Sequence, residues 1–197
     1  FIIFNDCSLD RKGKIADELT KKNKKIRSIH NNQNMGIGYN YRAGIELSQK
    51  EYYMMLTGEG EILSSSIKEI LSHSGEADIL ISYIGNPKVR PPYRTIISRG
   101  FTILLNMLFG LHIKYYNGNV IHKTELLKKV KMNTNNAAYQ AEVLIKMLKK
   151  GYSYKEVPIY IEETKGSELF RLRNLIDVFL TISKLFFDIN FKKHSQK

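Results

Sequence analysis

Residues 54–61 read Met-Met-Leu-Thr-Gly-Glu-Gly-Glu, an apolar run that ends abruptly in small residues and two carboxylates. In an extended chain, residues two positions apart project to the same side. Glu59 and Glu61 can therefore direct two oxygen ligands, with Thr57 as a third, at one point just past a buried strand. Such ligands suit a hard divalent cation that holds a diphosphate. The alternative is a solvated turn whose two acidic side chains only contact water.

The composition around this stretch is that of a globular protein. At 197 residues, with 43% hydrophobic and 25% charged residues, the chain can form one sizeable domain with a core. Thirty-one Lys and Arg residues against 19 Asp and Glu residues give a net charge of +12, which predicts an anionic partner. The aromatic residues are scattered and do not form a basic and aromatic surface, so we expect no nucleic acid. The single Cys7 excludes an internal disulfide.

Short apolar runs alternate with helix-period segments in the first half. We expect strands at residues 1–4, 26–30, 52–56 and 78–83, with helices at 11–22, 36–49 and 64–73. This alternation predicts an α/β, Rossmann-like fold with a mostly parallel central sheet. Ligands of such sheets bind beyond the carboxyl ends of the strands, where both Asp6 and residues 57–61 fall. The chain opens inside a strand-like run, so we expect the first strand of the fold to be missing.

The second half is richer in helices. Residues 85–93 contain three of the four prolines and predict a loop. We expect helices at 94–111, 124–131 and 137–150, a short strand at 120–122, and an edge strand at 154–161 around Pro158. A final amphipathic helix is expected at 171–187. No apolar run reaches the roughly 18 residues of a membrane-spanning helix.

Two further segments follow expected strands and carry polar or small residues. Asp6 and Ser8 come directly after the first strand, where a carboxylate can accept hydrogen bonds from a nucleoside. The alternative is that they cap the next helix. Asn34, Gly36 and Gly38 open a helix whose N-terminus could attract phosphate. A plain tight turn is the alternative there.

Together and in order, these segments resemble a family 2 glycosyltransferase, closest to the polyprenyl-phosphate (dolichyl-phosphate mannosyltransferase-like) branch. The resemblance extends over essentially the whole chain. The residues that carry it are Asn5-Asp6-Cys7-Ser8-Leu9-Asp10, Asn34-Met35-Gly36-Ile37-Gly38 followed by Arg42 and Gly44, Leu56-Thr57-Gly58-Glu59-Gly60-Glu61, Arg94 with Ser98-Arg99, Tyr116-Asn117-Gly118, Glu142, Gly151-Tyr152 and Glu156-Val157-Pro158-Ile159.

The resemblance implies a GT-A fold and transfer of a sugar from a nucleoside diphosphate donor (UDP- or GDP-linked), assisted by Mg²⁺ or Mn²⁺. The implied acceptor is polyprenyl phosphate or a cell-surface glycan. The implied site consists of donor-binding Asp6, Ser8, Asn34, Gly36 and Gly38, metal-binding Thr57, Glu59 and Glu61, phosphate-binding Arg94 and Arg99, and Glu142 on the acceptor side, where a general base would act on a hydroxyl acceptor.

The chain also departs from the family pattern. Thr57 stands where the first metal-binding aspartate is expected, and Asn5 replaces the first of two paired aspartates. Glu168-Leu169 stands where the closing loop has Ser-Lys. These changes leave an alternative open, in which the chain is a catalytically weakened GT-A module that acts as a binding or assembly subunit.

We expect residues 1–170 to form the catalytic domain and residues 171–197 to form an amphipathic helix with a basic tail. An apolar stripe flanked by bases can lie in a membrane interface, or it can pack on the sheet as an ordinary terminal helix. The first alternative predicts a cytoplasmic protein that is peripheral at the inner face of the membrane. A homo-oligomer also remains open.

Overall fold

The computed structural model describes residues 1–58, 60–162 and 172–190. Its elements follow one another as β1 (Ile2–Asn5), α1 (Lys12–Lys22), β2 (Arg27–His30), α2 (Ile37–Leu47), β3 (Tyr52–Met54), α3 (Ser64–Ser72), β4 (Ile79–Ile84), a 3-10 turn (Pro87–Val89), α4 (Pro92–Phe109), β5 (Val120–Lys123), α5 (Thr124–Leu127), α6 (Tyr139–Lys149), β6 (Tyr154–Ile159) and α7 (Leu172–Asn190). Each expected strand and helix is present, with ends that shift by a few residues.

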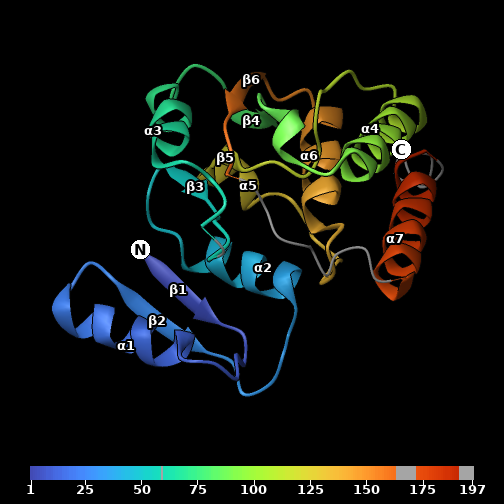
Figure 1. The fold of residues 1–197 in the computed structure, drawn as a ribbon. Coiled ribbons are helices and arrows are strands. Elements are labelled where there is room, and N and C mark those ends of the chain that lie inside the picture. The colour runs from blue at the N-terminus through green and yellow to red at the C-terminus, as the bar shows by residue number, and fades with distance from the viewer. Residues whose placement is uncertain (59, 163–171, 191–197) are drawn as a thin grey trace.

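The strands form two sheets in the described part of the chain. β1 pairs with β2 in parallel, and the other four strands lie in the order β3-β5-β4-β6. Figure 1 shows β1, β2 and α1 together on one side of the molecule, with α2 between them and the larger sheet. The α/β class is confirmed. The sheet pairing is mixed rather than mostly parallel, because β5 inserts between β3 and β4 and runs antiparallel to both.

β6 is the edge strand that Pro158 predicted. It pairs in parallel with β4, and Pro158 lies opposite Tyr83. Proline has no backbone N–H, so an edge position avoids an unfilled place in the ladder. Beyond β6, an isolated antiparallel bridge joins Ile161 to Ile62, which ties the segment after β3 to the end of β6.

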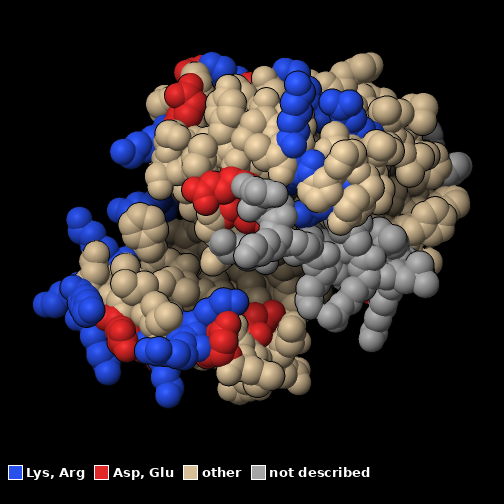
Figure 2. Space-filling model, viewed as in Figure 1, with Lys and Arg blue, Asp and Glu red and all other residues tan. Residues whose placement is uncertain are grey.

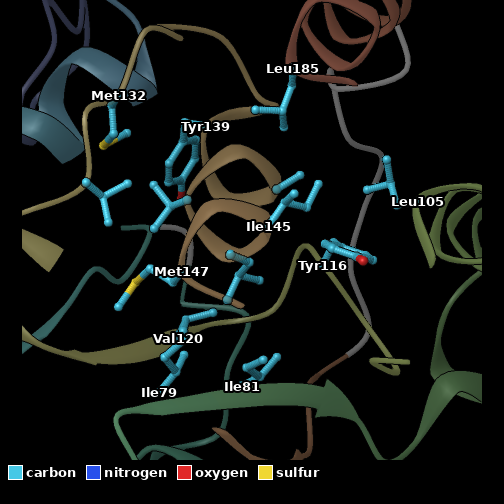
Figure 3. Close-up of a cluster of buried hydrophobic side chains, with 14 of the residues drawn as sticks. Ile79, Ile81, Leu105, Tyr116, Val120, Met132, Tyr139, Ile145, Met147 and Leu185 are labelled. Carbon is cyan, nitrogen blue, oxygen red and sulfur yellow. The ribbon is translucent and has the colours of Figure 1, made fainter. Parts of the chain in front are cut away.

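The main core surrounds α6, whose apolar positions repeat at helical spacing. Its residues Ala141, Val143, Leu144, Ile145 and Met147 are all fully buried. Figure 3 shows Tyr139, Ile145 and Met147 of this helix above Val120 of β5 and Ile79 and Ile81 of β4. Burial of this many large side chains supplies the main stabilisation of the larger sheet.

Helices α4 and α7 lie side by side at the edge of the molecule (Figure 1), with the rings of Phe109 and Phe186 6.1 Å apart. Ile182 and Leu185 of α7 are buried in the core. The two helices also expose large apolar residues, which we call the α4/α7 apolar face: Ile96, Ile103, Met107, Phe179, Leu180 and Phe187. A cavity of about 350 Å³ between the helices is lined by Phe101, Leu104, Leu108, Val178, Phe179, Ile182, Ser183, Phe186 and Phe187.

No helix in the ranges that the structure describes is both long enough and apolar enough to cross a membrane.

Candidate functional site

The carboxylate of Asp6 joins the end of β1 to the start of α2. It accepts hydrogen bonds from the backbone N–H groups of Met35 (2.8 Å) and Gly36 (2.9 Å) and from Nδ2 of Asn31 (2.7 Å). Burial alone would raise the pKa of Asp6, but these hydrogen bonds outweigh it and lower the pKa below its usual value. The alternative, in which Asp6 caps α1, is not seen in the structure. Asp10 instead accepts the N–H of Lys12 there, at 2.9 Å.

Ser8 and Asn34 lie on the two turns that meet at Asp6. Ser8 is exposed, and its backbone N–H donates to Oδ1 of Asn5 at 3.1 Å. Asn34 Oδ1 accepts the N–H of Gly36 at 3.1 Å. The structure thus brings Asp6, Asn34 and Gly36 together, as expected, at the carboxyl end of β1.

Gly36 and Gly38 allow close backbone approach, but the group that approaches belongs to this chain. The N–H of Gly38 donates to the carbonyl of Asn135 at 3.0 Å. A Cβ on Gly38 would lie 2.5 Å from the carbonyl oxygen of Thr134, and one on Gly36, which has φ +87°, 2.7 Å from that of Asn135. Packing against residues 134–135 therefore explains why both positions need glycine, and no bound phosphate is required to explain them.

The segment after β3 does not have the extended geometry expected of it. β3 ends at Met54, and Gly60 adopts a φ of +71°, so the alternation that would align positions 59 and 61 is broken. Thr57 is exposed, and Glu61 is half-buried with its carbonyl accepting the N–H of Glu162 at 2.9 Å. Glu59 lies outside the described residues.

Metal-binding clusters are absent from the described ranges, which omit Glu59. No group of three or more His, Cys, Asp or Glu side chains there could hold a metal ion. The expected metal ligands Thr57, Glu59 and Glu61 thus remain a prediction.

Arg94 and Arg99 lie on different faces of α4. Arg94 is 7% exposed, whereas Arg99 is exposed. Five residues correspond to about 500° of helical rotation, which leaves the two side chains roughly 140° apart. The structure therefore does not place both guanidinium groups at one phosphate.

Glu142 of α6 is buried, and its carboxylate is occupied by groups of the same chain. It accepts the N–H groups of Asn133 (3.0 Å to Oε1 and 3.2 Å to Oε2) and Thr134 (3.0 Å to Oε2), and it forms an ion pair with Lys146. Beside it lies a cavity of about 250 Å³, lined by residues 133–136 and by Leu180, Thr181, Lys184, Leu185 and Asp188 of α7.

Sequence reasoning missed the segment 132–136 as a structural junction. Arg42 of α2 donates to the carbonyl of Met132 at 3.3 Å and to Oδ1 of Asn135 at 2.6 Å. Asn136 donates to Oγ1 of Thr181 on α7 at 3.1 Å. The run Asn133-Thr134-Asn135-Asn136, with no apolar residue ahead of a buried helix, was the one available signal.

The charged side chains are unevenly spread over the surface. Figure 2 shows Lys and Arg gathered over α1 and the adjoining strands, while acidic side chains lie on both sides of the hollow between this part and the rest of the molecule. A net charge of +12 favours anionic ligands overall.

Comparison with solved structures shows the same fold. Glucosyl-3-phosphoglycerate synthase from Mycobacterium tuberculosis, in complex with Mn²⁺, UDP-glucose and phosphoglyceric acid, superposes with a TM-score of 0.69 at 13% identity, over 94% of this chain and 68% of that one. The same enzyme with Mg²⁺ and UDP gives a TM-score of 0.67 at 13% identity, over 93% and 67%. No curated protein sequence matches the chain significantly.

The sequence itself matches one family model. The model described as "Glycosyl transferase family 2" matches residues 1–130, which is more than half of the chain and includes Asp6, the α2 glycines and the segment after β3. The chain therefore belongs to glycosyl transferase family 2 and is a glycosyltransferase with a GT-A fold.

Proposed function

We propose that the protein transfers a sugar from a UDP- or GDP-linked donor to polyprenyl phosphate or a cell-surface glycan, as in the polyprenyl-phosphate branch of the family. One observation carries the proposal. Asp6, at the carboxyl end of β1, is held against the N-terminus of α2 by its bonds to Met35 and Gly36. Ligands of α/β sheets bind at such a point, and solved relatives of this fold hold UDP or UDP-glucose.

The donor side of the proposed site consists of Asp6, Ser8, Asn34 and Gly36. The Asp6 carboxylate has acceptor capacity beyond its three hydrogen bonds from this chain, and it and the Asn34 amide can supply acceptor oxygens for a nucleoside. Gly38 supports these residues indirectly. Its N–H donates to the carbonyl of Asn135, and this bond holds the first turn of α2 in place. Arg99 is exposed on α4 and can contact a phosphate, whereas Arg94 is buried on another face of that helix.

Mg²⁺ or Mn²⁺ fits the chemistry of the residues that follow β3. Thr57 and Glu61 flank one exposed turn and offer hard oxygen donors, and Glu59 lies between them in sequence. When bound there, the cation would neutralise the charge that builds on the leaving diphosphate. The chain's own residues hold the nucleoside and keep the reacting groups in place.

We also propose that the protein is cytoplasmic and binds the inner face of a membrane through the α4/α7 apolar face. Ile96 (69% exposed), Met107 (71%) and Phe179 (67%) are large apolar side chains in contact with solvent. Arg99 and Lys184 lie exposed on the same two helices. Apolar side chains beside cations, on a protein of net charge +12, suit an anionic bilayer surface, where a polyprenyl acceptor would reside.

The test is a donor screen on the full-length protein with Mn²⁺ and UDP- and GDP-sugars, with Glu59→Ala as the variant. We expect turnover of one donor, and we expect Glu59→Ala to abolish it. Glu125→Ala changes an exposed carboxylate on α5 and should leave turnover intact. The substituted metal motif at Thr57 favours one rival function, a binding subunit. Partner binding without a donor, combined with no turnover of any donor, would support it.

A further inference from the structure

The segment 132–136 is held from three directions. From α6, Glu142 accepts its N–H groups at Asn133 and Thr134. From α2, Arg42 donates to Met132 and Asn135, and the N–H of Gly38 reaches the carbonyl of Asn135. On the side of α7, Asn136 donates to Oγ1 of Thr181 and to the carbonyl of Asp177 at 3.3 Å.

This segment is also in direct contact with the proposed donor site. Its Asn135 carbonyl accepts the N–H of Gly38, in the first turn of α2. One residue before α2, the N–H of Gly36 donates to Asp6 at 2.9 Å. A displacement of residues 134–135 would therefore move the start of α2 and the groups that orient Asp6.

The Glu142 carboxylate has little freedom to act as a base. Its side chain is 3% exposed, and both oxygens accept hydrogen bonds from the backbone of the segment 132–136. Oε1 also pairs with the ammonium of Lys146. A general base must reach the proton it removes within hydrogen-bond distance, and these contacts occupy the oxygens that would do so.

We infer that Glu142 is a positioning residue for the sugar donor, acting through the segment 132–136 on the N-terminus of α2. Arg42 performs the same function from the opposite side of the segment. This inference rests on the proposed function, since it assigns Glu142 to donor binding at that same site. It also replaces the acceptor-side role that the family resemblance implied for Glu142.

The variants Glu142→Gln and Arg42→Met test the inference in the full-length protein. Gln keeps the shape of the side chain but presents an N–H₂ group to one of the backbone donors, so the segment loses a partner. We expect UDP affinity with Mn²⁺ to fall and the donor KM to rise, each by roughly tenfold, because small displacements at a site are costly. We expect kcat to stay within about threefold of wild type.

Lys146→Met adds a pH readout. This change removes the cation beside Glu142 and its hydrogen bond to the Lys131 carbonyl, and it leaves the N–H groups of Asn133 and Thr134 bonded to Glu142. If Glu142 only positions the segment, kcat falls at the same acidic pH in the variant as in wild type. If Glu142 is the base, the pH at which kcat falls changes, and this is what we call a moved acidic limb.

Three outcomes overturn the inference. The first is a loss of kcat of about 10² or more in Glu142→Gln with unchanged donor KM, as expected for removal of a general base. The second is a moved acidic limb in Lys146→Met. The third is unchanged UDP affinity in Arg42→Met, which decides the matter even if Glu142→Gln fails to fold. Absence of UDP and GDP binding by the wild type would instead refute the proposed function.

Discussion

The backbone N–H of Gly36 donates to the carboxylate of Asp6 at 2.9 Å, so the residue that follows β1 is tied to the residue that precedes α2. The N–H of Met35 donates to the same carboxylate. Two N–H groups just before a helix are thereby satisfied by one anion, which also complements the positive end of the helix dipole. The position of α2 relative to β1 therefore depends on a charge at residue 6.

Asp6→Asn removes that charge and turns one acceptor oxygen into a donor. We expect the free energy of unfolding to fall by about 1–3 kcal/mol, because a backbone N–H loses its acceptor. The effect should shrink at acidic pH. The pKa of Asp6 is lowered in the fold, so its contribution is present above the ordinary value of 3.8 and is lost as the pH falls through the lowered value.

Urea unfolding at pH 7 and pH 3 measures this difference. Asp10→Asn is the matched control, because Asp10 is exposed and accepts the N–H of Lys12 at the start of α1. Equal stability of Asp6→Asn and wild type at pH 7 would contradict the assignment.

Gly38→Ala should destabilise the protein through a steric conflict with its own backbone. The added Cβ would lie 2.5 Å from the Thr134 carbonyl oxygen and 2.8 Å from Cα of Asn135. Since backbone atoms cannot rotate away, we expect a loss of about 1–3 kcal/mol, together with weaker UDP binding. Thermal unfolding with and without UDP and Mn²⁺ reports both effects.

Gly100→Ala is the opposite case and serves as the control. Gly100 lies within α4, and a Cβ there meets nothing within 4 Å. Alanine in an open helix interior should stabilise by up to about 1 kcal/mol. A Gly38→Ala protein as stable as Gly100→Ala would show that the segment 132–136 does not press on α2.

The elements could be predicted from the sequence because each has its own periodicity. The buried positions of α6, such as Val143, Leu144 and Met147, follow directly from helical spacing. The pairing of β5 could not be predicted. Four residues, Val120–Lys123, carry no signal for direction or neighbour, and these depend on contacts with β3 and β4.

The site was predictable where local chemistry decides it. Asp6 and Gly36 were expected at one donor site because the family resemblance implied it, and their contact follows from the parallel pairing of β1 and β2. The role of residues 133–136 was not predictable, because it arises from α2, α6 and α7 meeting in space. The separation of Arg94 and Arg99 was available from the sequence, since positions five apart cannot share a helix face.

His122 of β5 should make the protein less stable in mild acid. It is fully buried, and neither ring nitrogen has a hydrogen-bond partner within the described ranges. Burial lowers the pKa of His122 to about 3. The unfolded chain takes up this proton below about pH 6.5 and the folded chain does not, so stability falls by up to about 1.4 kcal/mol per pH unit between those values.

His122→Leu should remove this pH-dependent loss of stability. Between pH 7 and pH 5 we expect wild type to lose about 2 kcal/mol more than the variant, in urea unfolding at both pH values. His112→Gln, at an exposed position, should follow wild type. Parallel losses in wild type and His122→Leu would show that His122 does not cause the acid sensitivity.

The α4/α7 apolar face should bind anionic bilayers. Met107→Glu and Phe179→Glu each place a carboxylate on an apolar, exposed position of this face. Both changes oppose insertion and repel anionic lipid, so co-sedimentation with vesicles of phosphatidylglycerol and phosphatidylcholine should fall at least severalfold. Leu71→Glu, at an exposed apolar position on α3, controls for charge alone. If all three variants sediment equally, general electrostatic attraction explains the binding and the face has no part in it. If only the α4 and α7 variants lose co-sedimentation with the vesicles, the apolar side chains themselves enter the membrane interface.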